Sequence, residues 1–285
     1  MAQDSKLGTP LGNSVTVSSL GQADDTALLS NNLRHLQYLL YLSEAFCNRN
    51  QVKLCADKTK LQVFFTKSMQ AEVRYAMITS PIKLNNEEIK FSLTAEHVGI
   101  LRCTSGNQTT ILTRITAHKA ALGAVLHTGM ARGHRGNPAA SLGVEQLYGL
   151  PVLLSGLATL VLTKREEGII EQHHKDTISN LQRLLPCTPT PVVCFLAGTL
   201  PGSAHIHLRQ LTIFGMIIRL SGNTLQVYDS NLFKSGSSPS KSWFQQIEEI
   251  CVKYKLPSPS ELLQTPLPKL QFKRLVKKNV MDFWE

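Results

Sequence analysis

The first hundred residues show the apolar pattern of short strands arranged around one helix. Two apolar stretches, at 15–20 and 27–29, flank a polar turn, which predicts an antiparallel hairpin over residues 13–30. Leucines at helical spacing predict an amphipathic helix over 31–48. A basic turn followed by a strand is expected within 52–65, with further short strands at 73–78, 89–93 and 97–101.

After residue 106 the apolar positions follow the helical period. Helices are predicted within 111–126, 151–162, 164–185, 205–220, 243–254 and 269–285, with a short buried element at 192–196. Asn137 is expected to cap a helix that Pro138 opens. A serine-rich linker is expected at 235–240. The predicted fold class is therefore α+β, in three segments: 1–105, 106–234 and 235–285.

Composition favours a basic protein with a sizeable core. The chain has 285 residues, 42% of them hydrophobic, and a net charge of +10, which indicates a polyanionic partner, first of all nucleic acid. The longest apolar run, 151–162, is too short to span a bilayer, so no membrane partner is expected. Six scattered cysteines indicate reduced thiols in an intracellular protein. Nucleus and cytoplasm both remain open.

Two adjacent carboxylates, Asp24 and Asp25, lie in the polar turn of the predicted hairpin. Successive side chains on a strand point to opposite faces, so the pair can serve one site only at a turn. Burying two bare carboxylates is costly, so they are either solvated or bound to a cation. Mg²⁺ accepts one or two such ligands, and two ions can stabilise a phosphoryl transfer. A simply solvated turn is the alternative.

Three short motifs follow one another in a characteristic order: Ala-Asp-Asp at 23–25, Lys-Thr-Lys at 58–60 and His-Val-Gly-Ile at 97–100. This order resembles the reverse transcriptase palm of non-LTR (LINE-type) retrotransposons, from the third catalytic motif onward. The resemblance implies that Asp24 binds the catalytic Mg²⁺, or alternatively Mn²⁺, with Asp25 in the supporting position. Lys58, and less directly Lys60, would lie near the incoming deoxynucleotide. Val98 and Gly99 would form the primer-grip turn.

The chain departs from the family pattern at several positions. Gln22 stands where an aromatic residue is frequent, and Cys55 where an asparagine is expected. The other metal-binding aspartate of the family comes from an earlier motif, and no acid-bearing strand precedes Gly21; Asp4 is a poor substitute. We therefore expect the isolated chain to be inactive.

By the same resemblance, the helical part corresponds to the thumb and post-thumb region, which tracks the duplex of RNA template and DNA primer. Between Glu96 and Glu145 the chain carries basic residues but no acid. The candidate nucleic-acid contacts are Arg114, Lys119, Arg132, Arg135, Lys273 and Arg274. A solvated helix–helix turn is equally open for the loop of Arg132 and Arg135, and a solvated face for the C-terminal helix.

The histidines give weaker signals. His118 falls in an apolar stripe, which is typical of a core or rim histidine, and His173 and His174 are adjacent rather than three or four residues apart. Three hypotheses about function remain: an RNA-directed DNA polymerase fragment, a non-catalytic basic nucleic-acid-binding remnant, and a degenerate fragment without a selected role. The identity of the template and the oligomeric state stay open.

Overall fold

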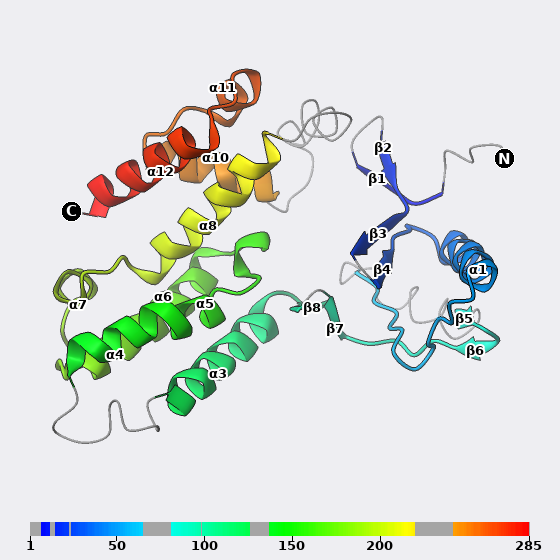
Figure 1. The fold of residues 1–285 in the computed structure, drawn as a ribbon, viewed down its shortest axis with the longest axis horizontal. Helices are drawn as coiled ribbons and strands as arrows, with labels where there is room; N and C mark the ends of the chain where they lie inside the picture. Colours follow the sequence, from blue (N-terminus) through cyan, green and yellow to red (C-terminus); the bar gives the residue numbers. More distant parts are fainter. Residues whose placement is uncertain are drawn as a thin grey trace. The chain divides into compact units, whose positions relative to one another are not determined.

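The computed structural model describes residues 7–11, 15–22, 24–64, 81–97, 99–125, 137–219 and 242–284. The chain divides into two compact units, Met1–Gly106 and Asn107–Glu285, which appear with their labelled elements in Figure 1. Among the described residues, small antiparallel hairpins and one long helix form the first unit, and helices form the second. The expected α+β class is confirmed in this general form.

Two hairpins begin the first unit. Strand β1 (Thr9–Leu11) pairs with β2 (Val15–Val17), and β3 (Ser19–Gln22) pairs with β4 (Asp25–Leu28), all antiparallel. The hairpin predicted over 13–30 is therefore confirmed for β3 and β4, whereas β2 pairs with β1 instead. The ladder of the second hairpin closes where the Leu29 N–H donates to the Ser18 carbonyl oxygen at 2.8 Å.

The predicted helix of this unit is α1 (Leu33–Arg49), and it is confirmed. The Asn32 side chain caps it by accepting a hydrogen bond from the Arg34 N–H at 2.8 Å. Its buried face joins a small core of Leu40, Leu61, Ile82, Leu84 and Ile89. Polar contacts also hold α1 against the short hairpin of β5 (Lys83–Leu84) and β6 (Glu87–Glu88). The Gln37 side chain forms two hydrogen bonds with the backbone of Lys83: its amide nitrogen donates to the Lys83 carbonyl oxygen, and its amide oxygen accepts from the Lys83 N–H.

The strands predicted within 52–65 and at 89–93 are wrong as regular strands. The two extended segments meet through a single parallel bridge between Leu61 and Phe91, so neither builds a ladder. The strand predicted at 97–101 is a hairpin turn instead: His97, at the end of β7 (Thr94–His97), pairs with Ile100, at the start of β8 (Ile100–Cys103). Gly99 supplies the left-handed conformation that the turn needs, with φ of 69°. The predicted strand at 73–78 lies outside the described residues.

Helices make up the described part of the second unit. They are α3 (Gln108–Val125), α4 (Pro138–Val144), a π-helical turn η3 (Glu145–Gly149), α5 (Leu150–Leu153), a 3-10 turn η4 (Leu157–Thr159), α6 (Lys164–Gln182), α7 (Thr190–Ala197), α8 (Gly202–Ile217), α10 (Trp243–Lys253), α11 (Pro259–Gln264) and α12 (Lys269–Trp284). The long predicted helices are confirmed as α3, α6, α8, α10 and α12. The Asn137 cap is also confirmed, since its side chain accepts from the Ala139 N–H at 3.0 Å.

The single helix predicted over 151–162 is wrong. Helix α5 ends at Leu153, and Gly156 turns the chain in the left-handed region with φ of 74° before η4 begins. Leu153, Leu154 and Leu157 are all buried. The apolar run therefore reflects burial from several sides rather than one continuous helix.

In the described part of the second unit, two apolar cores hold the helices together, and α6 and α8 lie side by side between them (Figure 1). One core joins α3, α5 and the apolar run around η4 to α6. The other joins α8 to α10, α11 and α12. The described part of the predicted segment 235–285, residues 242–284, therefore packs on α8. The predicted linker at 235–240 and its boundary lie outside the described residues.

Candidate functional site

The hairpin of β3 and β4 places two carboxylates at its tip. Gln22 pairs with Asp25 at the end of the ladder, so Asp24 lies in the turn and Asp25 begins β4. Both aspartates are exposed, and their carboxylates therefore keep their hydration and remain open to a cation. The predicted position of the pair at or beside the turn is confirmed. Ala23 lies outside the described residues.

The aspartate pair suits a hydrated hard cation. Carboxylate oxygens are the ligands that Mg²⁺ prefers, and Mg²⁺ commonly keeps several waters when one or two carboxylates hold it. Within the described ranges, no group of three or more His, Cys, Asp or Glu side chains is arranged to hold a metal ion. By themselves, Asp24 and Asp25 offer a cation two exposed carboxylates.

The two candidate nucleotide-binding lysines lie in the same unit. Lys58 is in a turn that the Thr59 N–H closes on carbonyl oxygens at 3.1 Å, and Lys60 follows it. Both lysines are exposed. In the described part of this unit, neither forms an ion pair or hydrogen bond with Asp24 or Asp25. Their exposed ammonium groups remain available to a phosphate.

The candidate nucleic-acid contacts of the second unit fall on two separate helices. Arg114, which is half-buried, and Lys119, which is exposed, are on α3; Lys273 and Arg274 are exposed on α12. Helices α6 and α8 lie between α3 and α12 (Figure 1), so the two pairs of residues belong to helices that are not neighbours. Arg132 and Arg135 lie outside the described residues.

A buried histidine cluster joins the helices of the second unit. It consists of His118 on α3, Glu145 on η3, His173 and His174 on α6, and His205 on α8; His173 and His205 are half-buried, and the other three are buried. His118 is 0% exposed and Glu145 is 1% exposed. His118 Nε2 lies 3.1 and 3.0 Å from the two Glu145 carboxylate oxygens, and His118 Nδ1 lies 2.8 Å from His173 Nε2. One imidazole therefore bridges a carboxylate and a second imidazole inside the core.

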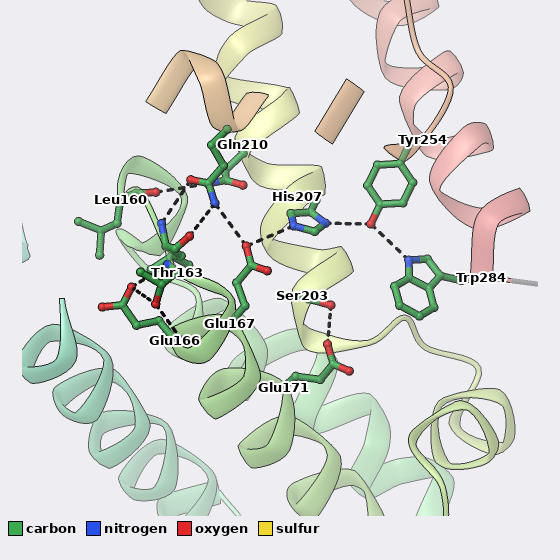
Figure 2. Close-up of polar contacts among 12 residues, drawn as sticks. Leu160, Thr163, Glu166, Glu167, Glu171, Ser203, His207, Gln210, Tyr254 and Trp284 are labelled. Atoms are coloured by element: carbon green, nitrogen blue, oxygen red, sulfur yellow. Dashed lines mark hydrogen bonds and ion pairs between the residues drawn. The ribbon is translucent and has the colours of Figure 1, made fainter. Parts of the chain in front are cut away.

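A second buried network connects α6, α8, α10 and α12 (Figure 2). Trp284 Nε1 donates to the Tyr254 hydroxyl at 3.3 Å, and that hydroxyl lies 2.9 Å from His207 Nδ1. His207 Nε2 faces the Glu167 carboxylate at 3.5 Å. Burial raises the pKa of Tyr254 to about 12, so the phenol stays protonated and donates to His207. We interpret this network as a structural clamp that holds the end of α12 on α8.

The sequence indicated neither network. His118 was expected in the core or at its rim, and its burial confirms that, but its partners were not foreseen. A usable signal was present: Glu145 is the first acidic residue after Glu96 and lies in an otherwise apolar segment. A carboxylate in such surroundings needs a buried partner, and His118 is the imidazole of the preceding apolar stripe.

Comparison of the chain with the models of known protein families, with curated proteins and with solved structures gives no match. In the part of the chain that the structure describes, no helix combines the length and the apolar character needed to cross a membrane.

Proposed function

We propose that this chain is part of an RNA-directed DNA polymerase of the non-LTR retrotransposon type, comprising the later part of the palm, the thumb and the region after it. The observation that supports the proposal is the antiparallel hairpin with Asp24 in its turn and Asp25 beside it. Helix α1 follows at once and packs its apolar face in the core of the same unit. A solvated turn would need neither this order nor the lysines that come after it.

In this proposal each residue has a defined task. Asp24 holds Mg²⁺ through its carboxylate, and Asp25 supports it from the start of β4. When bound, Mg²⁺ supplies stabilisation of the attacking primer hydroxyl and of the leaving pyrophosphate. Lys58, with Lys60 behind it, neutralises phosphate charge on the incoming deoxynucleotide. The basic residues of the helical unit hold the duplex of RNA template and DNA primer through its backbone.

In this proposal Asp24 and Asp25 supply one side of the metal site, and a single exposed carboxylate pair leaves most of the Mg²⁺ shell to water. We therefore expect no primer extension by the bare chain with Mg²⁺ or Mn²⁺. Extension should appear when a segment that carries a second metal-binding aspartate is fused to the chain or added to it. In that reconstituted protein, Asp24→Ala should abolish extension and leave duplex binding nearly unchanged, because the basic helical unit is untouched.

The assay is a primer-extension gel on an RNA template. It compares the bare chain, the fusion, the fusion with Asp24→Ala and the fusion with Asp57→Ala. Asp57 is a matched control, since it is also an exposed aspartate in a turn of the first unit. An active Asp24→Ala fusion would remove Asp24 from its metal-binding role. Extension by the bare chain would show that residues 1–285 already contain a complete site.

The second candidate function is a basic nucleic-acid-binding protein without catalysis. It is favoured by the net charge of +10 and by the exposed cations of α12. A duplex-binding measurement on the same proteins, beside the primer-extension gel, separates the two functions. A fusion that binds the RNA–DNA duplex but extends no primer, at any divalent ion concentration, fits the second function alone.

A further inference from the structure

The buried histidine cluster is the largest group of ionisable side chains in the described part of the second unit that the proposed function leaves unused. Its members come from four elements, α3, η3, α6 and α8, so every contact within it ties helices together. Besides the link from Glu145 to His118 and on to His173, the His174 ring stacks edge-on against His205, with centroids 5.7 Å apart. His205 Nε2 lies 3.1 Å from the Thr199 hydroxyl.

The bond between His118 and His173 sets how many protons the pair can hold. With both rings neutral, His118 donates its Nε2–H to Glu145 and accepts at Nδ1 from His173. With one added proton, the pair still has one donor and one acceptor across this contact, because the accepting ring carries its own proton on its other nitrogen. The contact survives, and the added charge lies near the Glu145 carboxylate. A second proton would place two N–H groups face to face at 2.8 Å, so the hydrogen bond is lost and two cations repel.

His174 has even less capacity for a proton. It is 1% exposed, its Nδ1 has no hydrogen-bond partner among the described residues, and its Nε2 is 4.0 Å from Glu145 Oε1. A second proton on the ring would create a buried charge with no close acceptor. Glu145 is already engaged by His118 at 3.0 Å, so it cannot serve His174 equally well.

Other charges near the cluster do not remove this limit. Lys119 opposes a charge on His173 and Arg209 opposes one on His205, whereas Asp176 favours a charge on His173. The Glu171 carboxylate is engaged by the Ser203 hydroxyl, and Arg114 lies one turn before His118 on α3. Helix α7 contributes the buried Cys194 thiol. Helices α4 and α5 carry no ionisable side chain.

We propose that the buried histidine cluster is an acid-sensitive lock, which takes up one proton with its contacts intact and releases α3 and η3 from α6 and α8 when more protons bind. The released surface is apolar, because the core beneath α3 contains Ile111, Leu153 and Ile170. Opening therefore exposes part of one of the two cores of this unit.

The pKa values of three cluster members set the direction of the effect. Burial lowers the pKa of His173 and of His205 to about 4 and that of His174 to about 3. In the opened state these imidazoles return toward the ordinary pKa of about 6.5. Because the closed-state pKa values are lower, the lock is at full strength above pH of about 6.5 and weakens as the pH falls toward 4. Each proton taken up on opening raises the opening constant about tenfold per pH unit.

The test is hydrogen exchange of the full chain by mass spectrometry between pH 7.5 and 4.5, with rates corrected for the intrinsic pH dependence of exchange. We expect protection of α3 (Gln108–Val125) to fall below pH of about 6.5 by more than tenfold per pH unit, which indicates more than one proton. In His173→Gln the amide still donates to His118 but does not titrate, so the fall should be shallower by about tenfold per unit. His35→Gln on α1, in the other unit, is the matched control and should leave the profile unchanged.

Two results would overturn the proposal. One is α3 protection that stays flat down to pH 4.5, and the other is a His173→Gln profile that equals the wild-type profile. If His173→Gln is already open at pH 7.5, histidine C2–H titrations of the wild-type chain by NMR decide instead. Three histidines that remain neutral until the chain opens support the lock, whereas three that titrate individually near pH 6.5 refute it.

Discussion

Gly149 tests the packing around Glu145 most directly. It is the last residue of the π-helical turn η3, and a β-carbon built on it would fall inside the van der Waals contact distance of Glu145 Oε2. The added β-carbon would also lie 2.9 Å from His118 Nε2. Both side chains are buried, so neither can move away into solvent. We therefore expect Gly149→Ala to separate Glu145 from His118.

Two opposing effects set the size of this loss. Alanine is favoured over glycine inside a helix by about 1 kcal/mol, which would stabilise the variant. Breaking a buried ion pair or leaving a buried carboxylate without its partner costs about 3–5 kcal/mol. The second effect is larger, so the net destabilisation of the second unit should be about 2–4 kcal/mol at neutral pH.

Urea unfolding followed by tryptophan fluorescence measures this change. Trp243 and Trp284, the two tryptophans of the chain, both pack in the second unit, so the signal reports on that unit. Gly168→Ala in α6 is the matched control, because a β-carbon there meets no atom within 4 Å. The control should gain up to about 1 kcal/mol. Equal stability of Gly149→Ala and Gly168→Ala would refute the packing argument.

Two further predictions concern α12. Gly215→Ala should destabilise the second unit by about 1–3 kcal/mol in the same urea assay, because the new β-carbon would lie 2.5 Å from Cδ1 of the buried Phe272 ring; stability equal to wild type would contradict this. The chain should bind an RNA–DNA duplex with micromolar or weaker affinity that falls steeply with salt, and a double substitution of Lys273 and Arg274 by alanine should reduce the salt slope by about 1.8. The control is the double substitution of Lys164 and Arg165 by alanine, which removes the same charge from equally exposed positions on α6. Fluorescence anisotropy at several salt concentrations measures the binding of both variants. Equal salt slopes for the two variants would exclude α12 from the interface.

Elements whose own residues carry the full signal could be predicted from the sequence. Helix α1 has leucines at helical spacing and an asparagine cap, and both features are local. The aspartate turn is local as well, because Asp24 and Asp25 separate two short apolar stretches that can pair with each other. Helices α3, α6, α8, α10 and α12 followed in the same way. For these segments, local preference and tertiary packing favour the same conformation.

Segments whose conformation depends on distant partners could not be predicted. Val15 and Val17 suit a strand in either hairpin, and their pairing with β1 is decided outside the segment. The apolar run after Leu150 is typical of one buried helix, yet Gly156 breaks it and both halves are buried. The histidine cluster is the clearest case: His118 and Glu145 are bonded only because η3 approaches α3, and Gly149 permits that approach.

The proposed chemistry and the buried polar networks belong to different units of the chain. Asp24, Asp25, Lys58 and Lys60 are exposed side chains of the first unit, and exposed groups add little to stability. The histidine cluster and the Tyr254 network are buried in the second unit, where loss of a hydrogen-bond partner is costly. Substitutions at Asp24 should therefore change metal-dependent chemistry without moving the tryptophan-monitored unfolding of the second unit. Substitutions at Gly149 should shift the unfolding of the second unit but leave metal-dependent chemistry unchanged, in a reconstituted protein assayed well below its unfolding transition. Each proposal can therefore fail without the other.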